Sequence, residues 1–77
     1  MTNNLKLEGT ISRIGMIPGT FYVVAREDRR TYGIDVRRIE GYRGETFKEL
    51  GIKVGAQVRF GTTDDPPIVT SAEVIRG

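Results

Sequence analysis

Residues 18–36 read PGTFYVVAREDRRTYGIDV, and this stretch decides the fold class. A Pro-Gly turn signal leads into aromatic and β-branched residues, a short charged segment follows, and a second alternating run closes the stretch. The pattern predicts a hairpin whose connection is the charged segment 27–30. Because neighbours on a strand point to opposite faces, we expect Phe21 in the core and Tyr22 on the outer face.

Three further runs alternate with period two and predict three more strands, near residues 5–12, 57–61 and 68–75. Gly9 interrupts the first of these runs, where a bulge or a sharp bend is the usual reason. The residues that share the apolar face of each of the five strands are Leu5, Leu7, Ile11, Phe21, Val23, Tyr32, Ile34, Val36, Val58, Phe60, Ala72 and Val74.

The long connection between the third and fourth strands, residues 36–55, contains four glycines and does not favour a regular helix. Residues 46–50 are expected to form one helical turn, held to the core by Phe47 and Leu50. Five short strands with one long connection predict an all-β chain, folded as a five-stranded OB-type barrel with one long loop between strands 3 and 4. An SH3-like barrel is the alternative, since strand spacing separates the two poorly.

The amino-acid composition argues against several classes of function. The 77 residues suffice for one domain, 1–77, and contain neither cysteine nor histidine, which argues against an enzyme and against a metal or other cofactor. The pair Asp64-Asp65 before two prolines is expected to form a solvated turn, not a metal site or an acid–base pair. No signal peptide and no run long enough to span a membrane is visible, so we expect a cytoplasmic protein without a membrane partner.

The charge is mildly basic, with a net charge of +2 and a pI of about 9.3. Nine of the twelve basic residues are arginines, whose planar heads suit phosphates and bases. This bias favours a polyanionic partner, and the alternative is that the arginines only decorate a solvated surface.

Read in order, four segments of the chain resemble the cold-shock domain, an OB barrel that binds single-stranded RNA and DNA. Residues 7–11, LEGTI, are similar to the family's first strand, and IEG at 39–41 with FKEL at 47–50 is similar to its Ile-x-Gly-x-Gly-Phe-Lys-x-Leu segment. VGAQVRF at 54–60 and AEV at 72–74 are similar to its Glu-Gly-Gln-x-Val-x-Phe and Ala-Asn-Val segments. The resemblance implies an OB barrel and single-strand binding.

Both ribonucleoprotein motifs of that family are degraded in this chain. The first falls on residues 18–22, where Thr20 replaces one aromatic and Tyr22 keeps the outward ring. The second falls on residues 32–36, where Gly33 and Val36 replace aromatics and Asp35 replaces a histidine. The family's exposed tryptophan falls on Arg13. Residues 8–11, 19–24 and 50–58 also resemble bacterial translation initiation factor one and S1-type domains, which bind RNA with fewer stacked rings.

The candidate contacts form two groups. Arg13 and Tyr22, if their strands are adjacent, form a stacking pair for a nucleobase, or alternatively a cross-strand contact that only covers the sheet. The second group combines basic residues with a tyrosine at the start of the long connection, which suits a single strand but also a solvated loop. Its members are Arg37, Arg38, Tyr42 and Arg43.

These observations predict a non-enzymatic protein that binds single-stranded nucleic acid weakly, with strong salt dependence and RNA as the expected preference. The alternative is a protein-interaction or assembly module, with a protein partner or a second copy of the chain, that has lost the nucleic-acid face. The arginines near the second connection, Arg26, Arg29 and Arg30, are expected to form ion pairs within that turn.

Overall fold

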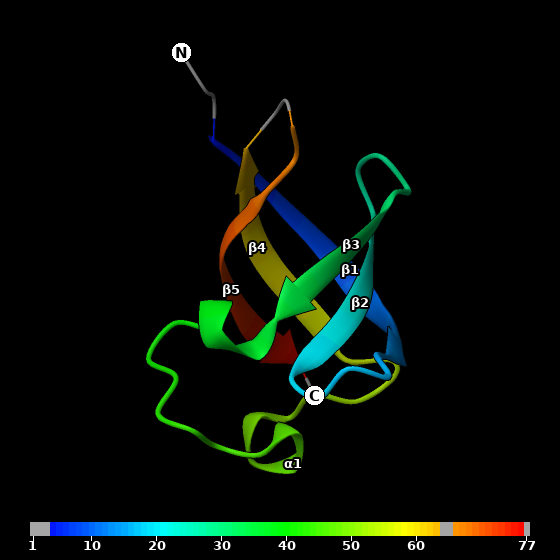
Figure 1. The fold of residues 1–77 in the computed structure, drawn as a ribbon. Coiled ribbons are helices and arrows are strands. Elements are labelled where there is room, and N and C mark those ends of the chain that lie inside the picture. The colour runs from blue at the N-terminus through cyan, green and yellow to red at the C-terminus, as the bar shows by residue number, and fades with distance from the viewer. Residues whose placement is uncertain (1–3, 64–65, 77) are drawn as a thin grey trace.

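The computed structural model describes residues 4–63 and 66–76. Five strands form one curled sheet, in which every neighbouring pair is antiparallel, with the order β3-β2-β1-β4-β5 (Figure 1). The elements are β1 (Asn4–Ile14), β2 (Thr20–Ala25), β3 (Thr31–Asp35), the 3₁₀ turn η1 (Val36–Arg38), α1 (Phe47–Leu50), β4 (Gln57–Thr63) and β5 (Val69–Arg76).

The sheet curls until its two edges approach each other. Ile39, just after η1, forms a parallel bridge with Ala72 of β5, and the Glu40 backbone N–H donates to the Ala72 carbonyl at 2.9 Å. The result is an all-β curled half-barrel, which agrees with the predicted five-stranded OB-type barrel and its long loop between β3 and β4. Among the described residues, no helix is long and apolar enough to cross a membrane.

The core is one cluster that fills the inside of the curl. Phe21 and Phe60 are its largest fully buried members. Phe60 contacts the ring of Tyr32, with the ring centroids 5.1 Å apart. The alternation of buried and partly exposed residues along β2 confirms the expected placement of Phe21 inside.

One predicted core position and one predicted strand boundary differ from the structure. Leu5, near the start of β1, is 42% exposed, and at this position the strand pairs with β4 alone. Val36 is buried as expected but lies in η1, since β3 ends at Asp35.

Gly9 sits where β1 crosses closely over β2. A Cβ atom built at Gly9 would lie 2.3 Å from the Val24 carbonyl oxygen and 2.6 Å from Val23 Cγ1. The irregularity in the β1–β2 pairing itself lies further along, between Ile11 and Arg13. The glycine therefore provides close approach, and the bulge belongs to Ser12.

The expected helical turn in the long loop is present. Thr46 caps α1 through a capping box, in which its hydroxyl accepts from the Glu49 backbone N–H and the Glu49 carboxylate accepts from the Thr46 N–H. Phe47 packs edge-on against Phe21, with ring centroids 5.9 Å apart, and Leu50 also packs on the core. The short helix thus covers one end of the barrel.

Candidate nucleic-acid interface

Arg13 and Tyr22 are direct partners across β1 and β2. The Arg13 guanidinium carbon lies 4.4 Å from the centroid of the Tyr22 ring, a cation–π geometry. Without an interruption, Arg13 would follow Leu7 and Ile11 on the inward face. The bulge at Ser12 adds one residue to β1, and this insertion turns Arg13 outward to meet Tyr22.

The Tyr22 ring lies between two glycines. A Cβ atom at Gly33, its partner on β3, would lie 3.3 Å from Tyr22 Cε1, and one at Gly15 would lie 3.2 Å from Cε2. By the resemblance to the cold-shock domain, Gly33 stands where that family has an aromatic ring. In the structure, Gly33 provides the space beside which the ring of Tyr22 lies, with the guanidinium of Arg13 over that ring.

Asp35 and Arg37 form a closed ion pair at the end of β3. Arg37 Nη2 lies 2.9 Å from Asp35 Oδ2, and both Arg37 Nε and its backbone N–H donate to Oδ1. These hydrogen bonds from Arg37 hold the pKa of the Asp35 carboxyl down to about 2. Asp35 in turn raises the pKa of Arg37 through the same hydrogen bonds. Asp35 therefore neutralises one of the predicted cations while its carboxylate caps η1.

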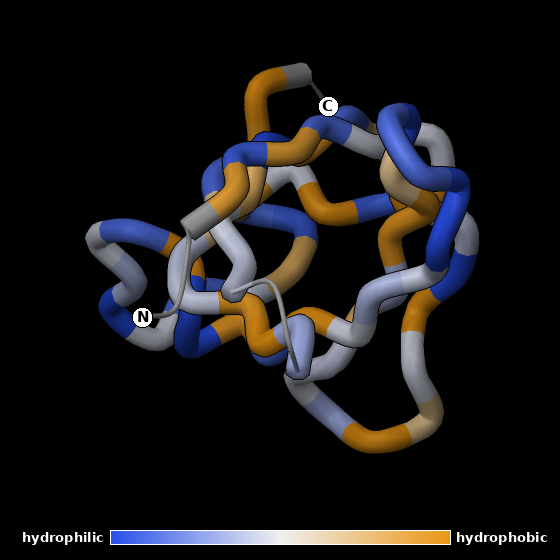
Figure 2. The backbone as a smooth tube through the Cα atoms, turned by 90° about the horizontal axis from the view of Figure 1, so that it is seen from above, coloured by the Kyte–Doolittle hydropathy of each residue, from blue (hydrophilic) through white to orange (hydrophobic). Residues whose placement is uncertain are grey.

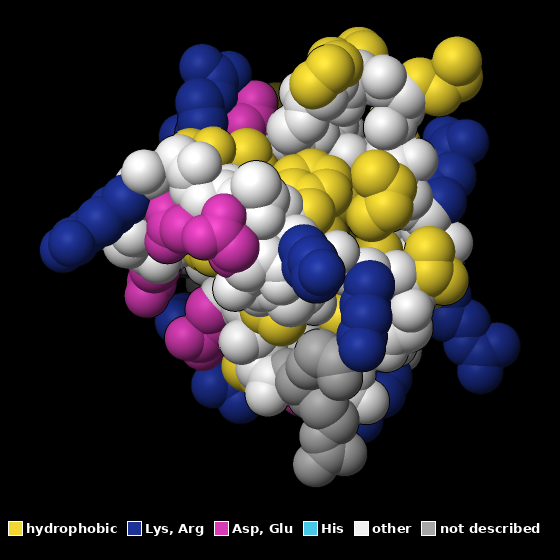
Figure 3. All heavy atoms as spheres, turned by 90° about the horizontal axis from the view of Figure 1, so that it is seen from below, with side chains coloured by type: hydrophobic (Ala, Val, Ile, Leu, Met, Phe, Trp, Pro, Cys, Tyr) yellow, Lys and Arg dark blue, Asp and Glu magenta, His cyan; other side chains and the backbone are white. Residues whose placement is uncertain are grey.

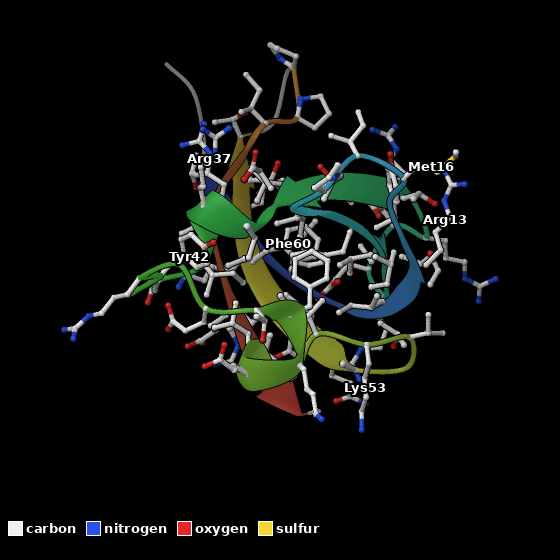
Figure 4. The ribbon with its side chains drawn as sticks, turned by 60° about the horizontal axis from the view of Figure 1, so that its bottom comes forward. Arg13, Met16, Arg37, Tyr42, Lys53 and Phe60 are labelled. Atoms are coloured by element: carbon white, nitrogen blue, oxygen red, sulfur yellow. The ribbon has the colours of Figure 1, made fainter. Side chains whose placement is uncertain are left out.

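The remaining predicted contacts are divided between surface and core. Arg38 and Arg43 are exposed, and the Arg43 backbone N–H donates to the Glu45 carboxylate. Tyr42 is half-buried and packs against the core, so its ring is only partly available. Arg13 lies on the opposite side of the molecule from Arg37 and Tyr42 (Figure 4). The structure thus separates the two groups instead of uniting them in one patch.

A charge ladder occupies another part of the outer sheet. Glu8 on β1 pairs with Arg26 at 3.0 Å and with Arg59 at 2.8 Å, and Arg59 also pairs with Glu73 at 3.3 Å. The predicted ion pairs within the turn 27–30 are wrong for the described residues: Arg26 pairs with β1, and Asp28 instead accepts from the Tyr32 hydroxyl and the Arg30 N–H. The second carboxylate of the turn, that of Glu27, accepts from the Glu8 backbone N–H, so both carboxylates make hydrogen bonds that fix the connection.

One predicted feature concerns metal ligands and the pair of aspartates near the end of β4. The ranges 4–63 and 66–76 contain no group of three potential metal ligands. The pair Asp64-Asp65 lies outside the described residues.

Comparisons with protein families, with curated proteins and with solved structures returned no match. On the surface of the described residues, the fold brings the predicted pair Arg13 and Tyr22 into direct contact.

Proposed function

We propose that this protein binds single-stranded nucleic acid, preferably RNA, through the outer face of β1, β2 and β3. The observation that carries the proposal is the guanidinium of Arg13 stacked 4.4 Å from the centre of the Tyr22 ring on a solvent-facing sheet. A base stacks on such a planar cation, and the in-plane N–H groups of the guanidinium remain available to a phosphate.

The layering assigns different roles to the two residues. Tyr22 is partly buried and supports Arg13 from below, whereas Arg13 is exposed. The outermost plane is therefore the guanidinium. Arg38, also exposed, belongs to the separate group beyond the end of β3, where Arg37 contributes less because Asp35 pairs with it.

The test separates stacking from charge. We expect a fluorescently labelled oligouridine to bind the wild-type protein at low salt, and Arg13→Lys to weaken this binding about tenfold although the net charge is unchanged. Arg30→Ala, which removes an exposed arginine from the β2–β3 connection, is the matched control and should weaken binding less. Equal binding by wild type and Arg13→Lys would remove stacking from the proposal, and no binding at low salt would refute it.

A second function is favoured by the ion pair at the end of β3. Asp35 would repel phosphate, and no aromatic ring stands at Gly33, so this part of the face also suits a protein partner or a second copy of the chain. Sedimentation of the isolated protein discriminates between the two. A stable oligomer that protects the amides of β2 and β3 from hydrogen exchange would favour the assembly module.

A further inference from the structure

Aliphatic side chains stand in solvent at the connection between β1 and β2. Met16 is 101% exposed and Ile17 is 71% exposed. The connection is an ordered turn, in which Gly15 N–H donates to the Thr20 carbonyl at 2.8 Å and Thr20 N–H to the Ile17 carbonyl at 3.2 Å. It projects outward from the barrel with an apolar stretch at its outermost part (Figure 2). An ordered apolar projection of this kind marks a binding surface.

A second connection adds to this projection. Gly55 N–H donates to the Ile11 carbonyl and Ile11 N–H to the Ala56 carbonyl, both at 2.9 Å, which ties the segment before β4 to β1. Val54, 62% exposed, stands in that segment. We define the aliphatic tip as the exposed apolar side chains of these two connections, Ile14, Met16, Ile17 and Val54.

The two segments that form the tip carry only basic charges, and the nearby Asp35, the β3 partner of Thr20, is paired with Arg37. No acidic residue occurs in residues 9–26 or 50–63, the two segments that form it. Arg13 and Met16 lie next to each other at the right of Figure 4, and Lys53 lies below them, at the bottom of the view. On the end of the barrel that carries α1, apolar side chains adjoin lysines and arginines, and most of the visible acidic side chains of the described residues lie at the left of the view, with one more near the top (Figure 3).

A ligand for this surface needs both negative charge and an apolar plane. A second copy of the chain in a symmetric contact is disfavoured, because Arg13 and Lys53 would face their own counterparts. A nucleic acid offers phosphates together with base faces, and the tip adjoins the Arg13–Tyr22 surface on β1 and β2. Aliphatic side chains, including Met and Ile, pack between or upon base pairs in known nucleic-acid recognition.

We propose that the aliphatic tip packs on the terminal base pair of a stem, and that the single-stranded extension of this stem crosses the Arg13–Tyr22 surface. The end of a stem is favoured over an internal step because its base face is already exposed and needs no unstacking. The preferred ligand is then a junction of duplex and single strand. This inference rests on the proposed function and specifies its substrate class.

The experiment compares one single-stranded RNA with two hairpins that carry the same sequence as a 5′ or a 3′ overhang. We expect the wild-type protein to bind one of the hairpins about tenfold more tightly than the single strand. The double variant Met16→Ser, Ile17→Ser should lose this preference and keep its affinity for the single strand. Both side chains are exposed, so the variant should fold, which its amide NMR spectrum checks.

Ile68→Ser is the matched control, because Ile68 is 53% exposed and belongs to the β4–β5 connection at the other end of the barrel. It should leave the hairpin preference unchanged. Equal affinity of the wild type for hairpins and single strand would overturn the inference while the proposed function stands. Binding of phosphatidylglycerol vesicles that depends on Met16 and Ile17, without a hairpin preference, would overturn it in favour of a lipid surface. A protein that binds no RNA of any kind would refute both proposals.

Discussion

At the scale of single residues, the outer face depends on glycines, which lack a Cβ atom, as much as on larger side chains. Gly15 and Gly33 leave the space in which the Tyr22 ring lies, and Gly9 lets β1 approach β2. Arg13 and Arg37 are both arginines beside a strand end, yet one lies on a ring and the other is paired with a carboxylate. The residue type alone did not distinguish these two states.

Gly9→Ala should destabilise the fold. Its Cβ would lie 2.3 Å from a backbone oxygen of β2, and backbone cannot yield as a flexible side chain does. We expect a loss of roughly 1–3 kcal/mol in the free energy of unfolding, measured by urea denaturation. Gly61→Ala is the control, because its Cβ would meet the Thr70 and Ser71 hydroxyls at 3.2 and 3.4 Å, which can rotate away. Equal stability of the two variants would contradict the close approach at Gly9.

Asp35 should titrate with a pKa of about 2, below the ordinary value of 3.8 for an aspartate, because Arg37 hydrogen-bonds the carboxylate. Since the pKa is lower in the folded state, the ion pair stabilises the protein above the unfolded pKa and this contribution is lost as the pH falls through about 2. The difference in Tm between wild type and Asp35→Asn should therefore shrink between about pH 4 and pH 2. A difference that stays constant over this range would contradict the ion pair.

At the scale of elements, alternation predicted the strands well, because burial of one face is a local property of the sequence. It placed Phe21, Val23 and Ile34 correctly. It placed Leu5 wrongly: Leu5 alternates in phase with the buried Leu7 but lies 42% exposed nearer the start of β1, and how far the core covers a strand is set by the rest of the fold, which no local pattern encodes. The outward turn of Arg13 depends likewise on a bulge, for which Ser12 carries no distinctive signal.

The contribution of the capping box of α1 to stability can be measured by changing a single side chain. Thr46→Ala removes the hydroxyl that accepts from the Glu49 N–H, and we expect a loss of about 1 kcal/mol in the free energy of unfolding. Thr46→Ser keeps the cap and should restore most of it. Urea denaturation of the three proteins measures both effects, and equal stability of the Ala and Ser variants would show that the cap contributes nothing.

At the scale of the whole molecule, one small hydrophobic core holds the five strands together. The barrel's largest buried side chains, Phe21 and Phe60, come from strands that are not neighbours in the sheet, so the core joins both halves of the curl. The resemblance to cold-shock domains predicted this architecture. It did not predict the separation of the two candidate groups of contacts, because the positions of Arg37 and Tyr42 are set by η1 and by packing against the core.

Phe60→Ala should remove a large share of the protein's stability. The substitution costs about 3–5 kcal/mol, and a chain of 77 residues is expected to have a total stability of only about 4–12 kcal/mol. A cooperative thermal transition of the whole chain, lowered by well over ten degrees, is the expected result. A variant that keeps a native spectrum and unfolds within a few degrees of the wild type would contradict a single shared core.

The bulge at Ser12 decides on which face of the sheet a positive charge lies. If β1 paired with β2 without the bulge, Ser12 would lie opposite Tyr22 and Arg13 opposite the buried Phe21, so the guanidinium would face the core and not the Tyr22 ring. Deleting Ser12, in contrast, would keep Arg13 on the outer face, because it would then follow the inward Ile11 directly and still lie opposite Tyr22. The binding face is thus specified by the register of a strand as well as by its side chains, and a register shift of one residue can erase it without any change of sequence.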